Sequence, residues 1–90
     1  MNQFCGGYTN ERPMDEETRS MIVSQKVKIE SSLNTKFSTF NPISYQTQVV
    51  AGINYKTRIE VGGGRTISVV LFKALPCYGG NVEVSEACFA

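Results

Sequence analysis

The chain has no histidine and no tryptophan among its 90 residues, and it has only three cysteines. Without histidine there is no imidazole to act as a general base, to bind zinc or to activate a serine or cysteine nucleophile. Cys5, Cys77 and Cys88 are too far apart in sequence to form a Cys-x-x-Cys metal clip. These absences argue against an enzyme, a metal site and a bound cofactor.

Charge is also scarce, and it is spread along the chain. Nine Lys and Arg residues against eight Asp and Glu give a net charge of +1, with no basic run. This balance gives no electrostatic reason to expect a nucleic acid or an anionic membrane as partner. No apolar run approaches the roughly 18 residues of a membrane span, so no membrane partner is expected.

The beginning of the chain lacks the basic region and apolar run of a signal peptide. Together with the odd number of cysteines, this predicts reduced thiols and a cytoplasmic location. A disulfide between Cys77 and Cys88 is allowed by their spacing but is not favoured.

The length predicts one domain, 1–90, near the lower end of the sizes that fold on a core alone. The hydrophobic fraction of 41% suffices for such a core. Residues 1–13 are polar and glycine-containing and show no periodicity, which predicts a mobile N-terminal arm. Their apolar cluster is Phe4-Cys5, just before Gly6. The arm is either a binding arm or a frayed terminus.

One long amphipathic helix is predicted from Asp15 to about Leu33. Asp15 can cap the first turn, and no Gly or Pro interrupts the segment. Apolar and neutral side chains form a stripe at helical spacing, comprising Met21, Ile22, Gln25, Ile29 and Leu33. Val23 and Val27 lie off its centre. The stripe is most simply a face for a core.

Four strands are predicted after the helix, over residues 41–47, 53–61, 65–74 and 81–85. Gly62-Gly63-Gly64 separates the second from the third. A glycine-rich loop that cradles phosphate needs a helix after it, but a strand follows here, so a hairpin turn is favoured. Short turns join antiparallel neighbours. The prediction is an α+β domain in which the helix packs on an antiparallel β-meander.

The stretch between the first two predicted strands is Gln48-Val49-Val50-Ala51-Gly52. Hairpin tips normally carry Asn, Asp, Ser and Gly, so two valines and an alanine are unusual there. Either the valines continue a long buried strand, or they form an exposed apolar tip that invites a partner. A later connection also begins with apolar residues, Leu75-Pro76. Alternate turns of a meander lie at one end of the sheet, so the two stretches should be neighbours.

These motifs resemble the stefin branch of the cystatin family. Gln48 to Gly52 matches the Gln-x-Val-x-Gly signature, and the similarity runs without a gap from Cys5-Gly6 to Leu75-Pro76. It also includes residues between and around these motifs, namely Glu17-Thr18, Phe37, Phe40, Asn54-Tyr55, Val61-Gly62 and Phe72. The signature alone is weak, but its combination with the upstream Gly, the downstream Leu-Pro and the spacing is strong.

The resemblance implies reversible, tight inhibition of papain-like cysteine proteases of the cathepsin type by a three-part wedge. Phe4 and Cys5 would occupy the acyl-side subsites, and Gly6 would turn the arm away from the catalytic thiol. The other side of the cleft would be filled by the first loop and the second, comprising Gln48, Val49, Val50, Ala51, Gly52, Leu75, Pro76, Cys77 and Tyr78.

The sequence departs from the family pattern in the second loop. Many stefins carry His after Leu-Pro, whereas this chain has Cys77-Tyr78. The contribution of this loop therefore depends on whether Tyr78 compensates. The alternatives are a non-inhibitory oligomerising or scaffold protein of the same fold and a small-molecule carrier, for which the domain leaves little room.

The protein is expected to be a monomer, with a domain-swapped dimer as a second form. Val49 and Val50 are β-branched where a turn prefers Asn or Gly, which predicts a strained tip. Opening the tip would join the strands on either side of it, and swapping of this kind occurs in stefin-like proteins.

Overall fold

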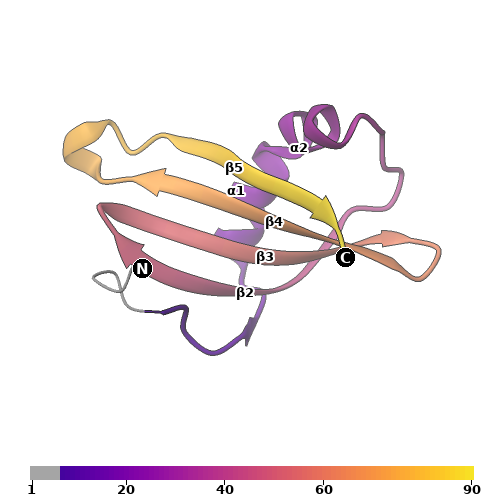
Figure 1. The fold of residues 1–90 in the computed structure, drawn as a ribbon, viewed down its shortest axis with the longest axis horizontal. Helices are drawn as coiled ribbons and strands as arrows, with labels where there is room; N and C mark the ends of the chain where they lie inside the picture. Colours follow the sequence, from indigo (N-terminus) through magenta and orange to yellow (C-terminus); the bar gives the residue numbers. More distant parts are fainter. Residues whose placement is uncertain (1–6) are drawn as a thin grey trace.

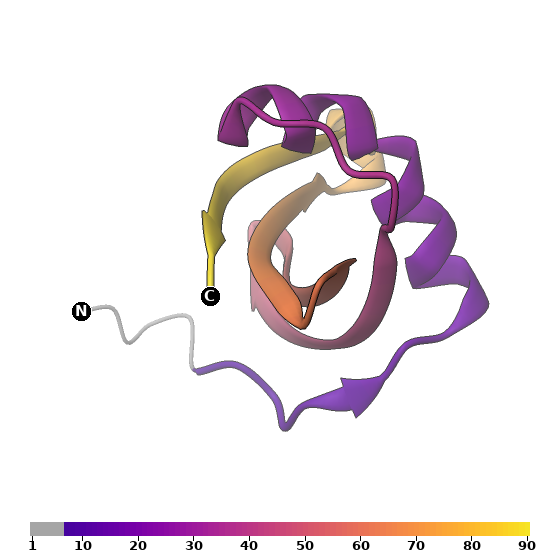
Figure 2. The same cartoon turned by 90° about the vertical axis from the view of Figure 1, so that its right-hand side faces the viewer.

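A computed structural model describes residues 7–90 of the chain. Its elements in chain order are β1 (Arg12–Pro13), α1 (Glu16–Ser24), α2 (Lys26–Leu33), β2 (Asn41–Val50), β3 (Gly52–Gly62), β4 (Arg65–Ala74), the 3₁₀ turn η2 (Pro76–Tyr78) and β5 (Val82–Phe89). Within this part of the chain the strands form one antiparallel sheet in the order β1-β2-β3-β4-β5. The helices lie together on one side of the curled sheet (Figure 1, Figure 2). The predicted α+β meander is thereby confirmed.

The single helix predicted from Asp15 to Leu33 is wrong in one respect, because it is divided at Gln25. The Ser24 hydroxyl donates to the Met21 carbonyl at 2.6 Å, and the Gln25 N–H turns to the Ile22 carbonyl at 3.0 Å. The side chain of Ser24 thus takes the acceptor that a continuous helix would offer to Gln25 N–H. Gln25 leaves helical geometry, with φ −104° and ψ 8°.

The helix termini follow the sequence signals. The Asp15 side chain accepts from the Thr18 N–H at 2.8 Å, as the predicted N-cap requires. Asn34 ends α2 in the left-handed conformation at φ 54°, which Asn tolerates better than most residues. Val23 and Val27 face solvent on these helices.

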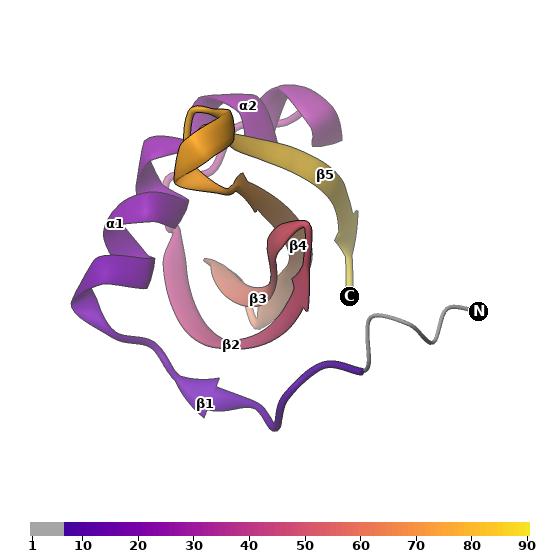
Figure 3. The same ribbon diagram turned by 90° about the vertical axis from the view of Figure 1, so that its left-hand side faces the viewer.

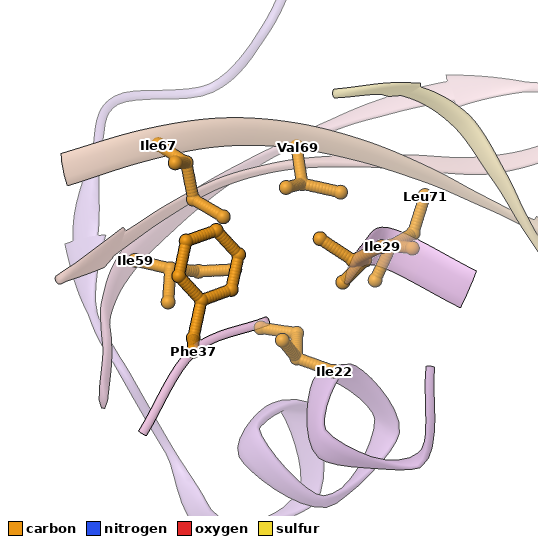
Figure 4. Packing of buried hydrophobic residues seen from close by; sticks show 7 residues of the cluster. All are labelled: Ile22, Ile29, Phe37, Ile59, Ile67, Val69 and Leu71. Carbon is orange, nitrogen blue, oxygen red and sulfur yellow. The ribbon is translucent and has the colours of Figure 1, made fainter. Parts of the chain in front are cut away.

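The core lies between the helices and the inner face of the sheet (Figure 4). Its buried members come from α1, α2, the connection to β2, and strands β3 and β4: Ile22, Ile29, Phe37, Ile59, Ile67, Val69 and Leu71. Each fully buried aliphatic side chain of this kind contributes about 1.5–3 kcal/mol relative to exposure. The rigid sheet that results is the support for the loops at its ends.

Three predicted strands are longer in the structure, and the third has the predicted bounds. β2 extends to Val50, β3 extends to Gly62, and β5 reaches Phe89. Phe89 packs against the Phe37 ring, with centroids 6.3 Å apart, which explains why the last strand continues beyond its alternating part. The turn at Gly62-Gly63-Gly64 is a hairpin, as predicted, at the right of Figure 1.

Candidate functional site

The first loop is a tight hairpin in which one residue is unpaired. Val49 is paired with Ile53 and Val50 with Gly52, so Ala51 alone forms the tip. Both sequence interpretations are therefore half right: the valines do continue the strand, but Val49 is 70% exposed and Val50 only half-buried. The strain predicted at the valines is not at these positions, because β-branched residues suit a paired strand.

Gly52 is required where the first hairpin meets β4. Its φ is +135°, a conformation that residues with a Cβ rarely adopt. A Cβ at this position would lie 2.6 Å from the Lys73 carbonyl oxygen and 2.8 Å from the Phe72 ring. The missing side chain thus lets the hairpin approach the strand that leads to the second loop.

The Gln48 side chain is hydrogen bonded across the same hairpin. The Asn54 amide donates to Gln48 Oε1 at 3.1 Å, and the two residues are direct partners in the ladder. This contact fixes the base of the tip from both strands. No sequence pattern pointed to this role of Asn54, although its position follows from a turn centred on Ala51, three residues from each partner.

The second loop is an ordered turn. The Leu75 carbonyl accepts from the N–H of Tyr78 at 2.9 Å and of Gly80 at 3.1 Å, and Ala74 N–H closes the loop on the Asn81 carbonyl at 2.9 Å. Its apolar side chains point outward, with Leu75 38% and Tyr78 72% exposed. Pro76 and Cys77 are exposed as well.

The two loops lie side by side, as the meander predicted. Gly52 is paired with Ala74, the residue just before Leu75. Both turns are at the left of Figure 1, and Figure 3 looks onto this end of the sheet. Neither loop contains a charged residue from Gln48 to Gly52 or from Leu75 to Gly80. Such a surface loses little free energy when it is taken out of water.

The N-terminal segment runs along β2 toward the same end. β1 pairs Arg12 with Tyr45, and the Thr9 N–H donates to the Thr47 carbonyl at 2.9 Å. Residues 9–13 are therefore hydrogen bonded to the sheet, where the sequence favoured a mobile arm over 1–13. Phe4, Cys5 and Gly6, the predicted arm residues of the site, lie outside the described residues.

Within residues 7–90, no group of three or more His, Cys, Asp and Glu side chains is placed to hold a metal ion. Cys77 and Cys88 are both free and exposed. Among the described residues there is also no helix long and apolar enough to cross a membrane. What this end of the molecule offers is a firm apolar contact surface.

Comparisons with known proteins show which sequences this chain resembles. The cystatin domain family matches residues 6–86. Cystatin-B of Oplegnathus fasciatus is 35% identical over 85 residues, which cover 94% of this chain and 85% of the relative. Cystatin-A of Mus musculus is 39% identical over 70 residues, covering 78% and 72%. Leukocyte cysteine proteinase inhibitor 1 of Sus scrofa is 35% identical over 73 residues, covering 81% and 71%.

Proposed function

This chain belongs to the cystatin family, in its stefin branch, and we propose that it inhibits papain-like cysteine proteases with a three-part wedge. The family consists of protease inhibitors, not enzymes. The observation that carries the proposal is the pairing of Gly52 with Ala74, because it joins two exposed apolar tips into one edge. The wedge would enter the cleft without offering a bond for cleavage.

The physics of the two loops favours tight binding. The first tip is held by strand pairing and by the bond from Asn54 to Gln48, and the second by hydrogen bonds to the Leu75 carbonyl. Loops already ordered in the free protein lose little conformational entropy on binding. Their exposed apolar side chains gain free energy when the cleft covers them.

The proposed contacts follow the loops. Val49, Val50 and Ala51 enter the cleft at the first tip, with Gln48 and Gly52 shaping it. Leu75, Pro76, Cys77 and Tyr78 form the second contact. Phe4 and Cys5 occupy the acyl-side subsites, and Gly6 redirects the arm at the catalytic thiol.

Titration of active papain with the protein tests the proposal. We expect complete, reversible inhibition that is relieved on dilution, with the inhibitor recovered at its original mass. Trypsin is the control and should keep its activity, because the wedge matches a different cleft. An absence of inhibition at micromolar concentration, or a covalent adduct in the mass spectrum, would contradict it.

The proposal also covers the oligomeric state of the protein and its location in the cell. The inhibitor acts as a monomer. It acts in the cytoplasm, and the exposed free thiols of Cys77 and Cys88 support this location, because a reducing compartment keeps thiols free. A domain-swapped dimer exchanges the halves on either side of the first tip. It is supported by the tip of a single residue between two long paired strands.

A further inference from the structure

The segment of residues 9–12, which runs into β1, is held to the sheet by side chains on both of its faces. On one face, Arg58 Nη2 donates to both carboxylate oxygens of Glu11, at 2.7 and 2.9 Å. The Ser44 hydroxyl donates to the same carboxylate. Because neighbouring residues of an extended segment point to opposite sides, the next residue reaches the other face.

On that other face, Arg12 lies against β2. Its Nη2 donates to Thr47 Oγ1 at 3.0 Å, and its guanidinium carbon lies 4.9 Å from the centroid of the Tyr45 ring. The charge is thereby paired with a hydroxyl and an aromatic face. Arg12 thus binds β2, and Glu11 binds β2 through Ser44 and β3 through Arg58.

Thr9 completes the attachment nearest to the loops. The Thr47 N–H donates to Thr9 Oγ1 at 3.1 Å, and Gln46 Nε2 donates to the Thr9 carbonyl at 3.0 Å. With the Thr9 N–H on the Thr47 carbonyl, three hydrogen bonds meet at this residue besides the contact between the two threonine hydroxyls. Antiparallel pairing brings each earlier residue closer to Val50, so Thr9 is the hydrogen-bonded residue nearest to the arm among those described, and the centroid of the Tyr8 ring beyond it lies 5.6 Å from Lys56 Nζ on β3.

We propose that Thr9, Glu11 and Arg12 form a clamp that positions the inhibitory arm beside the first loop. The inference rests on the proposed function, and it assigns these side chains no contact with the protease. Without the clamp, the backbone anchor that remains is the pairing of β1 with β2, which begins at Arg12 opposite Tyr45, followed by the hydrogen bond from Met14 N–H to the Ile43 carbonyl at 3.1 Å. The tether between Phe4-Cys5 and its anchor would then lengthen from about four to about seven residues, and the effective concentration of the arm at its subsites would fall about twofold.

A double-mutant cycle on the full chain tests the clamp. The clamp variant is Thr9→Ala/Glu11→Ala/Arg12→Ala, and the arm variant is Phe4→Ala/Cys5→Ala. We expect the clamp variant to raise the inhibition constant for papain by about three- to tenfold with the natural arm, since ordering of the segment is then lost. In the arm variant the same three substitutions should change it by less than about twofold, because the arm then has little left to position. Equal losses in both backgrounds, or no loss with the natural arm, would overturn the proposal.

Matched controls separate positioning from folding. Glu11→Arg/Arg58→Glu restores the ion pair with reversed charges and should inhibit within about twofold of the natural chain, whereas Arg58→Glu alone should not. All three clamp residues are exposed, so the melting temperature should hardly change.

Hydrogen exchange in the free protein makes the test independent of any protease. The Thr9 amide, whose acceptor is the Thr47 carbonyl that the substitutions leave in place, should exchange at least about tenfold faster in the clamp variant, as expected when a local opening becomes easier. Unchanged exchange would overturn the clamp even if papain is inhibited. Faster exchange in a chain that fails to inhibit papain would reject the proposed function and keep the clamp as an attachment of the segment.

Discussion

Single residues at the loop end determine whether the contact surface is apolar. Val50 is half-buried at the first tip, next to the exposed Val49. Val50→Asp places a charge in the centre of the proposed contact, where a buried anchor is worth about 2 kcal/mol or more. We expect inhibition of papain to weaken by at least about 30-fold, which corresponds to that free energy. Inhibition assays and circular dichroism on the same sample provide the measurement.

The matched control is Val27→Asp, the same substitution at a valine that is 76% exposed on α2, away from both loops. It should leave inhibition unchanged. If Val50→Asp instead abolishes the folded spectrum, Val50 belongs to the core and the tip is not a contact surface.

Substitution of Tyr78 tests whether its ring contributes to inhibition by the second loop. Its ring is 72% exposed on a turn held by hydrogen bonds, which suits an aromatic anchor. Tyr78→Ala should weaken inhibition by about tenfold, whereas Tyr78→Phe, which keeps the ring, should stay close to the natural chain. Equal inhibition by all three proteins would show that the Tyr78 ring makes no contribution to binding.

Asp15 gives the fold a pH dependence. The hydrogen bond from the Tyr45 hydroxyl at 2.5 Å, followed by those from Thr18, lowers the Asp15 pKa from its ordinary 3.8 to about 2. A lowered pKa in the folded state means that the stabilisation is fully present above the ordinary pKa and is lost as the pH falls toward the lowered one. Asp15→Asn should therefore melt below the natural chain at neutral pH, with the gap closing between pH 4 and pH 2.

Thermal melts across this pH range measure the effect. Tyr45→Phe removes the hydroxyl donor and should produce the same pH pattern with a smaller gap. A gap for Asp15→Asn that stays constant down to pH 2 would show that the capping bond does not depend on the charge.

At the scale of an element, the break in the helix lowers the free energy of unfolding, and a single substitution should recover part of it. Gln25 Oε1 is buried at the break and has no hydrogen-bond partner within the described residues. An unsatisfied buried polar atom costs about 1–3 kcal/mol, whereas an apolar group of similar shape does not. Gln25→Leu should raise the melting temperature by about 4–8 °C for each kcal/mol regained in a domain of this size.

Differential scanning calorimetry provides the measurement, and Ser24→Ala is the informative companion. Ser24→Ala removes the hydroxyl that occupies the Met21 carbonyl and should favour a continuous helix. A fall in melting temperature for Gln25→Leu would mean that the amide is satisfied in solution.

At the scale of the whole molecule, the first hairpin links two halves that could be exchanged between chains. Opening at Ala51 would join β2 and β3 into one strand, and every intramolecular contact would be re-formed between two chains. We predict that heating to just below the melting temperature, followed by cooling, yields a swapped dimer without inhibitory activity, because the first tip no longer exists.

Size-exclusion chromatography followed by papain assays on each peak tests this. The untreated monomer is the control for activity. A dimer that inhibits as strongly per chain as the monomer would show that the tip stays closed and that the dimer forms in another way.

The sequence by itself determined the helical segment and the four long strands, in their order, but neither β1 nor the break in the helix. The cap at Asp15, the stripe at Ile22 and Ile29, the triple-glycine turn and the bounds of β4 all depend on interactions within a few residues, which local patterns record. The position of the two apolar loops at one end also followed from strand order, because a meander alternates its turns between two ends.

Only the tertiary structure decided what depends on contacts between distant segments. The break at Gln25 needs the geometry of one hydroxyl, and the approach of Gly52 to Lys73 needs the register of β3 on β4. Apolar periodicity did not predict the attachment of residues 9–12, because polar side chains make it with partners more than 30 residues away in the sequence. Apolar periodicity records what a segment buries, and this segment is held by hydrogen bonds and an ion pair at an exposed edge.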